Sequence, residues 1–318
     1  MTSPDSTAGR KAAWKRGKRA LFVLACLGII EWGVQRVVGP ASGFVRRSAD
    51  PELGYELRRG TFQGAGLPVP TWEVPYRVDD NGCRIGLDEL PSDEADVIVL
   101  GSSMGFGMYV THEETISEVL ERAVAARGLK GVRFANCSVP GYRVLATLRA
   151  AVVRRAMKPK LVVSIMRPHQ MRQAFPYGEV ADPRSPVVTW MIKRSGLARL
   201  AWYLYWREPN SMRRPFVPDD ELKAALARYA TDMQGTRALF YLIDDKVDPY
   251  TYYRELRFWL TEHGVRVEPL KFPKLDDTRL FVDRQYHWSK EGAEMESALM
   301  IDALVEELRA AGLGQPSP

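Results

Sequence analysis

Short apolar runs alternate along the chain with longer segments whose apolar residues recur every three or four positions. The short runs are rich in β-branched residues and predict buried strands at residues 96–101, 132–135, 161–166, 238–243 and 265–270. The longer segments predict helices at residues 113–126, 145–157, 219–233, 251–263 and 290–311. Because strands that alternate with helices form right-handed βαβ units, the pattern predicts an α/β fold. We expect a flavodoxin-like, three-layer α/β/α domain with a mainly parallel five-stranded sheet.

A different pattern opens the chain. Residues 20–30 form an unbroken apolar run, ALFVLACLGII, which continues less cleanly to residue 38. A membrane span needs about 20 mostly apolar residues, whereas a run of about 10–14 also suits the core of a signal peptide. We favour one uncleaved transmembrane helix over residues 20–38, because no small-x-small cleavage site follows; a buried amphipathic helix is the other alternative. Trp32 suits the membrane interface, and Glu31 and Arg36 are expected there or paired with each other.

The distribution of charge supports this topology. The chain has 318 residues and a formal net charge of +6, but residues 1–19 contain six lysine or arginine residues against Asp5 alone. Positive residues beside a span stay in the cytoplasm, so we expect residues 1–19 to be a cytoplasmic arm on a single-pass inner-membrane protein with a periplasmic body. The body is nearly neutral, which disfavours nucleic acid as a partner.

The remaining segments divide the chain further. Residues 39–90 are rich in Gly, Pro and charge, and we interpret them as a linker and lead-in segment with short strands around residues 71–77. The globular domain is expected over residues 91–312. Within it, residues 171–218 gather aromatic and basic side chains and are typical of an insertion: a helix packed on the domain, a lid or a membrane-surface contact. Cys83 and Cys137 are expected to be separate buried thiols, although an oxidising compartment would allow them to pair.

Three loops at the expected strand ends carry candidate catalytic groups. Ser103 follows the first strand within a Gly-rich turn, which would present its hydroxyl and N–H at the carboxyl edge of the sheet. Gly141 follows the second strand and permits close approach of its backbone. His287 stands four residues after Asp283 and before the last helix, and a histidine oriented by an acid is what a serine nucleophile requires. Taken singly, each is equally an ordinary turn, with Ser289 as the N-cap of the last helix.

Together these residues resemble the SGNH, or GDSL-type, hydrolase family. Its motif blocks are a Gly-Asp-Ser turn after strand one, a Gly after strand two, an Asn after strand three and a C-terminal Asp-x-x-His. The resemblance covers roughly residues 50–310, and residues 76–84 look like the lead-in of membrane-anchored bacterial members. It implies that Ser103 is the nucleophile, that His287 is the base, and that the N–H groups of Ser103 and Gly141 form an oxyanion hole.

The sequence departs from this family pattern in three places. Ser102 stands where the family has Asp, which is not the nucleophile. The third block reads Met166-Arg167-Pro168-His169-Gln170, so that His169, or Arg167, falls near the oxyanion Asn; we assign His169. An imidazole N–H donates in a different geometry, and loss of one oxyanion donor costs about 10²–10³ in rate.

The third departure is the acid. The family's Asp lies three residues before the His, where this chain has Arg284. We assign the role to Asp283, with Asp276 or Asp277 as the alternatives.

The resemblance implies a membrane-anchored, extracytoplasmic serine esterase or O-acyltransferase. Its substrates would be acyl, chiefly acetyl, esters of envelope or secreted polysaccharide, cleaved through a Ser-His-Asp acyl-enzyme mechanism. No cofactor is implied, and the four histidines show no metal-ligand spacing. The alternative is a catalytically weak binding or assembly protein of a polysaccharide system, with polysaccharide assembly proteins as partners. The missing Asn and the displaced Asp favour it.

Overall fold

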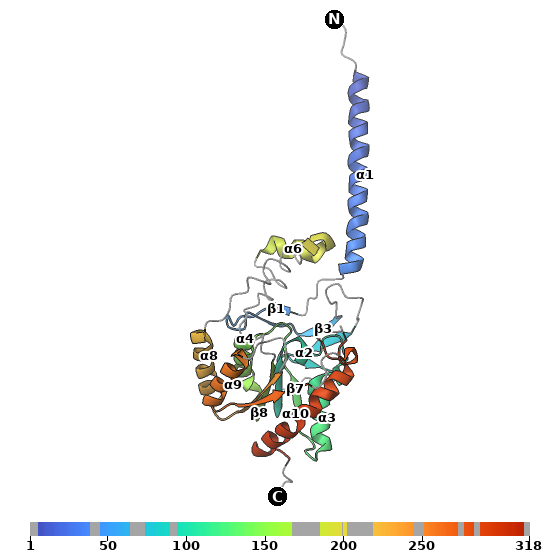
Figure 1. Ribbon diagram of the computed structural model, residues 1–318. Helices are drawn as coiled ribbons and strands as arrows, with labels where there is room; N and C mark the ends of the chain where they lie inside the picture. Colours follow the sequence, from blue (N-terminus) through green and yellow to red (C-terminus); the bar gives the residue numbers. More distant parts are fainter. Residues whose placement is uncertain are drawn as a thin grey trace.

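The chain folds around one mixed sheet, flanked by helices on both faces (Figure 1). The computed structural model describes residues 6–38, 45–63, 74–89, 94–166, 185–198, 200–201, 219–243, 251–272, 277–282 and 287–314. Over these residues the main sheet has eight strands, in the order β10-β9-β8-β6-β7-β5-β4-β3.

The parallel part of this sheet matches the strands predicted from the sequence. It consists of β6 (Val97–Gly101), β7 (Phe134–Asn136), β8 (Leu161–Met166), β9 (Arg237–Ile243) and β10 (Arg266–Leu270). Counted along the chain, their order across the sheet is second, first, third, fourth, fifth, which is the flavodoxin-like order. The chain reverses its direction of travel across the sheet between β7 and β8, so the edge where β6, β7 and β8 end is the expected ligand site.

The prediction of five strands was too few. Three antiparallel strands from the lead-in segment extend the sheet beyond β7: β3 (Gly60–Gln63), β4 (Pro75–Val78) and β5 (Arg84–Ile85). They are two to four residues long and lack a sustained apolar alternation, and only β4 overlaps the short strands expected around residues 71–77. Two further strands, β1 (Val45–Arg47) and β2 (Tyr55–Leu57), pair with each other outside the main sheet.

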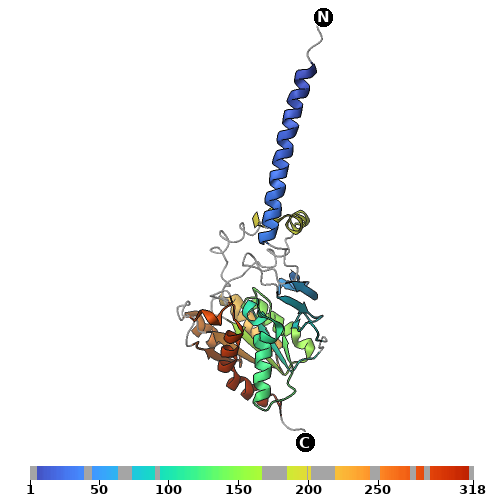
Figure 2. The same ribbon diagram turned by 90° about the vertical axis from the view of Figure 1, so that its right-hand side faces the viewer.

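Helices cover both faces of the sheet. Alternate residues of β6 point to opposite faces: Val97 and Val99 pack with α3 (Ile116–Ala126) and α10 (Lys290–Ala310), whereas Ile98 and Leu100 pack on the other side. That other face is covered by α4 (Val144–Arg154), α8 (Asp219–Asp232) and α9 (Thr251–Glu262). The three-layer arrangement is therefore confirmed, and Figure 2 shows the layers after a quarter turn. The short helices of the described regions are α2 (Ser103–Phe106), η1 (His112–Glu114), η2 (Arg155–Met157), α6 (Pro186–Arg194) and η4 (Thr278–Leu280).

Cys83 and Cys137 form a disulfide, contrary to the expectation of two separate thiols. Cys83 precedes β5 and Cys137 follows β7, and these two strands pair antiparallel with Arg84 opposite Asn136. This pairing brings the two Cα atoms to 4.0 Å from each other across 54 residues of sequence. The lead-in segment is thus joined covalently to the parallel sheet.

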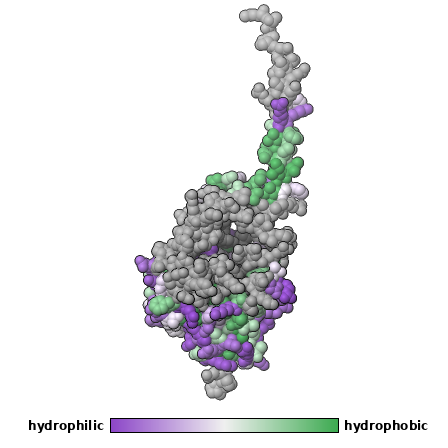
Figure 3. All heavy atoms as spheres, in the orientation of Figure 1, coloured by the Kyte–Doolittle hydropathy of each residue, from purple (hydrophilic) through white to green (hydrophobic). Residues whose placement is uncertain are grey.

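The N-terminal helix α1 (Ser6–Val38) projects away from the α/β domain (Figures 1 and 2). Along it the side chains of Leu21, Phe22, Leu24 and Ile29 are each at least 65% exposed, and they form part of the apolar surface seen in Figure 3. Within the described residues, no helix combines the length and the hydropathy that a membrane crossing requires. The Glu31 carboxylate near its end accepts hydrogen bonds from the Ser195 hydroxyl and the Leu197 N–H.

Candidate active site

Ser103 is the first residue of α2, directly after the carboxyl end of β6. The backbone is extended at the N-cap, Ser102, and then turns into the short helix, where the Phe106 N–H donates to the Ser102 carbonyl. The N–H groups in the first turn of a helix have no partner within that helix. Ser103 therefore stands at the carboxyl end of the first parallel strand, where the sequence placed it, and its role as nucleophile stays a prediction.

Close packing between α2 and the end of β7 holds this turn in place. Asn136 donates through Nδ2 to the Gly105 carbonyl at 2.9 Å, and its Oδ1 accepts from the Ser138 N–H. A Cβ on Gly105 would lie 2.6 Å from the Ser138 Oγ and 3.2 Å from the Ser138 Cβ, so a larger residue would force Ser138 to shift. Glycine at this position thus favours the close approach of α2 to the end of β7.

Gly141 occupies a tight turn beside the same strand end. The Tyr142 N–H donates to the Val139 carbonyl at 3.0 Å, and Gly141 has φ +84° after Pro140. Proline followed by a residue of positive φ is the pattern of a type II turn, which favours glycine at this position. The Val139 N–H in turn donates to the carbonyl of Gly101, the residue that ends β6. Gly141 therefore lies on a turn fastened to the strand that leads to Ser103.

The lead-in segment supports the Gly141 turn. The Tyr55 hydroxyl donates to the Pro140 carbonyl at 3.0 Å, and the Tyr142 hydroxyl donates to the Tyr55 carbonyl at 2.6 Å. The two rings meet edge to face with centroids 5.1 Å apart. Desolvation by burial raises the pKa of Tyr142 well above its usual range, so its hydroxyl remains a proton donor at any physiological pH.

His287 lies in the loop before α10, and its ring contacts Tyr109. The ring centroids are 5.0 Å apart and the ring planes are nearly perpendicular. Tyr109 follows Ser103 by six residues, in a loop that begins with a hydrogen bond from the Met108 N–H to the Ser103 carbonyl. The contact places the predicted base against the loop that follows the predicted nucleophile. Ser289 is the N-cap of α10, as expected, and accepts from the Gly292 N–H.

Arg84 holds the loop that follows Ser103. Its guanidinium is buried and donates to the carbonyls of Phe106, Gly107 and Val110. Burial lowers the pKa of Arg84 to about 10, so it is still charged at neutral pH. The rings of Tyr76 and Phe106 flank it, with centroids 4.6 and 5.2 Å from the guanidinium carbon. Charged hydrogen bonds to three carbonyls of this loop fix its path.

Sequence reasoning missed the residues that support the site: Tyr55, Arg84 and Tyr109. Tyr109 has φ +72°, an unusual conformation for a residue with a side chain, and its N–H donates to the Tyr76 hydroxyl. No local pattern distinguishes these residues, because each acts on a segment that is distant in sequence or through an unusual backbone conformation.

Other predicted site residues lie outside the described part of the chain. Asp283, His169, Arg167 and the alternative acid Asp276 are all there, and their roles stay predictions. Asp277, the second alternative acid, is described: it caps η4 and accepts from the Arg279 backbone and guanidinium.

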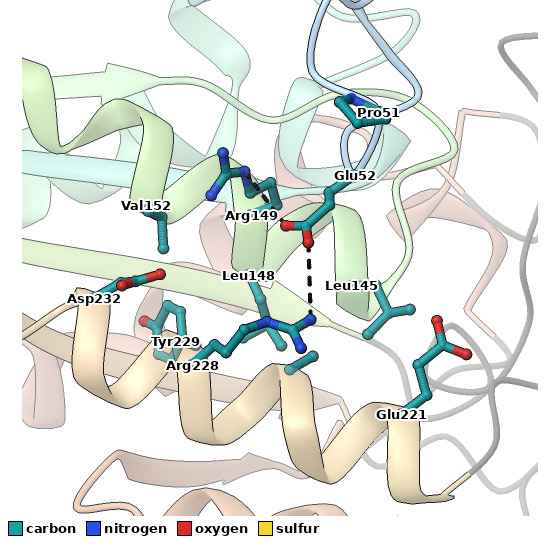
Figure 4. A pocket seen from close by; sticks show the side chains of 11 residues that line it. Pro51, Glu52, Leu145, Leu148, Arg149, Val152, Glu221, Arg228, Tyr229 and Asp232 are labelled. Atoms are coloured by element: carbon teal, nitrogen blue, oxygen red, sulfur yellow. Dashed lines mark ion pairs between the residues drawn. The ribbon is translucent and has the colours of Figure 1, made fainter.

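A cavity of about 440 Å³ lies away from these loops, between α4, α8 and the turn after β1 (Figure 4). Ion pairs join Glu52 at its rim to Arg149 and Arg228. Ser103, Gly141 and His287 are not among its lining residues, so it is distinct from the candidate active site.

Comparison with known proteins gives matches among solved structures only. No family model matches the chain, and no curated protein sequence matches it. Among solved structures, a lipase/acylhydrolase from Enterococcus faecalis is similar over 70% of this chain and 98% of its own, with 18% identity and a TM-score of 0.41. The psychrotrophic esterase EstA from Pseudoalteromonas sp. is similar over 67% of this chain and 99% of its own, with 13% identity and a TM-score of 0.41. A catalytic mutant of Axe2, an acetylxylan esterase from Geobacillus stearothermophilus, is similar over 72% of this chain and 99% of its own. The identity is 16% and the TM-score is 0.38.

Proposed function

We propose that this chain is a serine esterase of the SGNH type, acting on acyl esters and on acetyl esters of carbohydrates in particular. One observation carries the proposal: Ser103 begins a short helix at the carboxyl end of the first parallel strand, the turn of Gly141 is hydrogen-bonded to the end of that strand, and the His287 ring contacts Tyr109 in the loop that follows Ser103. This is the edge at which a doubly wound sheet binds ligands.

In the proposed mechanism, His287 takes the hydroxyl proton of Ser103 as the oxygen attacks the ester carbonyl. The oxyanion of the tetrahedral intermediate accepts hydrogen bonds from the N–H groups of Ser103 and Gly141 and from His169. The leaving alcohol takes the proton from His287, which leaves an acyl-enzyme at Ser103. Asp283 orients the imidazole and stabilises its protonated form.

The nucleophile that breaks down the acyl-enzyme determines which of two activities results. Attack by water, with its proton taken by His287, gives hydrolysis, whereas attack by a sugar hydroxyl gives O-acyl transfer. We propose hydrolysis or transfer of acetyl groups on envelope or secreted polysaccharide. Product analysis with acetylated polysaccharide and an unacetylated acceptor distinguishes the two.

We also propose that residues 20–38 anchor the protein in the inner membrane, with residues 1–19 in the cytoplasm and the domain in the periplasm. The exposed apolar side chains of α1 and the basic residues ahead of them support this topology. Extraction of membranes at alkaline pH tests it: an anchored protein stays in the pellet, and release into the supernatant would contradict the proposal.

Labelling with a fluorophosphonate probe tests the enzymatic function, because the probe reacts with activated serines. The wild-type chain should be labelled and should hydrolyse a chromogenic acetyl ester, whereas Ser103→Ala should do neither. Ser102→Ala, one residue away at the N-cap of α2, is the matched control and should still be labelled. No labelling of the wild type, or equal labelling of Ser103→Ala, would overturn the proposal.

A second candidate function is favoured by the third sequence block, where Met166–Gln170 stands in place of the family's Asn. A protein that lacks an oxyanion donor can retain the cleft as a carbohydrate-binding site in an assembly of envelope proteins. Binding of acetylated polysaccharide without turnover, unchanged in Ser103→Ala, is the result that would select this function.

A further inference from the structure

One histidine and two glutamates converge beside the loop that carries Tyr109. His112 Nε2 lies 3.3 Å from Glu89 Oε2 and 3.3 Å from Glu118 Oε1. All three atoms lie within 4.8 Å of one another. The three residues come from separate segments: the turn after β5, the short helix η1 and the first turn of α3.

The cluster has a buried wall and an open side. The His112 side chain is only 9% exposed, and that of Glu118 is 22% exposed. Glu89 is 53% exposed, which leaves a path from solvent. Its position is set by the backbone: Glu89 Oε2 accepts from the Gly86 N–H, and Arg77 donates to the Glu89 carbonyl.

The distances are those of ligands around an ion. Charged N–H···O hydrogen bonds are about 2.7–2.9 Å long, so two contacts of 3.3 Å are long for charged hydrogen bonds. Zn²⁺ binds nitrogen and oxygen ligands at about 2.0–2.2 Å in a tetrahedral arrangement, which places two ligand atoms roughly 3.3–3.5 Å apart. The observed separations between His112 Nε2 and the two carboxylate oxygens agree with this value.

Nε2 is the ring nitrogen of His112 that faces the two carboxylates. The other ring nitrogen, Nδ1, is buried and has no hydrogen-bond partner in the described part of the chain. An ion bound between the two glutamates would therefore be held by Nε2.

The cluster carries an excess of negative charge, because the carboxylates of Glu89 and Glu118 both lie against one histidine. A bound dication would offset this excess.

We propose that Glu89 Oε2, His112 Nε2 and Glu118 Oε1 bind a Zn²⁺ ion, with water in the fourth position on the side of Glu89. The inference is independent of the proposed esterase activity. The ion would join the turn after β5 to η1 and α3, and so hold the loop from Gly107 to Thr111 between two fixed ends. Its role would be structural, since none of the three ligands belongs to the proposed reaction.

Zinc titration of the full-length protein tests this site. The protein should carry no polyhistidine tag, should be stripped with a chelator, and should contain Cys26→Ser so that the free thiol binds no metal. Calorimetry with ZnCl₂ should then show one Zn²⁺ per chain. At about one hundred times the dissociation constant, zinc should raise Tm by roughly 5 °C.

Two variants distinguish binding of Zn²⁺ by specific ligands from non-specific electrostatic attraction of cations. Glu89→Gln removes an exposed ligand without threatening the fold and should weaken zinc binding at least tenfold. Glu113→Gln removes the same charge from an exposed residue of η1 that is not a ligand, and should change the affinity less than threefold. Absence of stoichiometric binding, or equal loss of affinity in the two variants, would overturn the proposal.

Discussion

The ring of Tyr109 meets the ring of His287 edge to face, with the centroids 5.0 Å apart. Tyr109 makes this contact from a left-handed backbone conformation, φ +72°, which costs a residue with a side chain about 1–3 kcal/mol. The Tyr76 hydroxyl and the Arg84 guanidinium hold the backbone around it. The strained loop is therefore stabilised by contacts from the lead-in segment, and it places an aromatic ring against the proposed base.

Tyr109→Leu should lower kcat by roughly 10–100-fold while KM changes little, because His287 loses the ring that limits its orientation. Tyr109→Phe keeps the ring and should retain activity within about threefold. Both are measured with a chromogenic acetyl ester, after circular dichroism confirms that each variant is folded. Full kcat in Tyr109→Leu would show that the ring contact does not position the base.

Gly141→Ala should lower both stability and activity. A Cβ at φ +84° is strained, which costs about 1–2 kcal/mol in the free energy of unfolding, and the turn would shift its N–H away from the oxyanion. We expect kcat to fall by about 10². Gly128→Ala is the matched control: Gly128 has φ +89° after α3, with open space around it, so it should lose similar stability but no activity. Equal activity in the two variants would argue against a role for Gly141.

Removal of the disulfide with Cys83→Ala and Cys137→Ala should destabilise the domain. The bond closes a loop of 54 residues, which by chain entropy corresponds to about 4 kcal/mol of unfolding free energy. Thermal unfolding should show Tm lowered by about 10 °C, and reductant should have the same effect on the wild type. Cys26→Ser, which removes the free thiol on α1, should leave Tm unchanged.

Glu307 should contribute to stability at neutral pH and lose that contribution in acid. Burial raises its pKa, but hydrogen bonds from Arg237 and Arg266 outweigh burial, so the folded-state pKa is lower than the unfolded one. The stabilisation is thus present above the unfolded pKa, near 4.5, and is lost as pH falls through the folded value.

Chemical denaturation at pH 7 and at pH 3 measures this effect. Glu307→Gln should lose about 1–2 kcal/mol at pH 7 and show a smaller difference from the wild type at pH 3. Glu306→Gln, at the adjacent exposed position, keeps the buried carboxylate and should lose less. A deficit in Glu307→Gln that is equal at both pH values would contradict the assignment.

The sequence predicted the parallel sheet well because strand and helix periodicity are local properties. β8 was predicted to the residue, and α4 and α9 were predicted with ends that differ by at most three residues. The loops of Ser103, Gly141 and His287 were chosen as candidates for the same reason: each directly follows or precedes a recognisable strand or helix. Of the lead-in strands, β4 overlaps the short strands predicted around residues 71–77, whereas β3 and β5 were not predicted, because β5 is two residues long and has no periodicity.

By itself, the sequence determined the alternation of five strands with their helices, and therefore which loops stand at the carboxyl edge of the sheet. Only the tertiary structure decided what those loops contact. The pairing of β5 with β7 brings Cys83 to Cys137, and chain folding brings Tyr109 to His287 and Glu89 to His112. Each of these pairs is far apart in the sequence, so no local pattern encodes it; the contacts arise from the register of the sheet and from the paths of the loops between its strands.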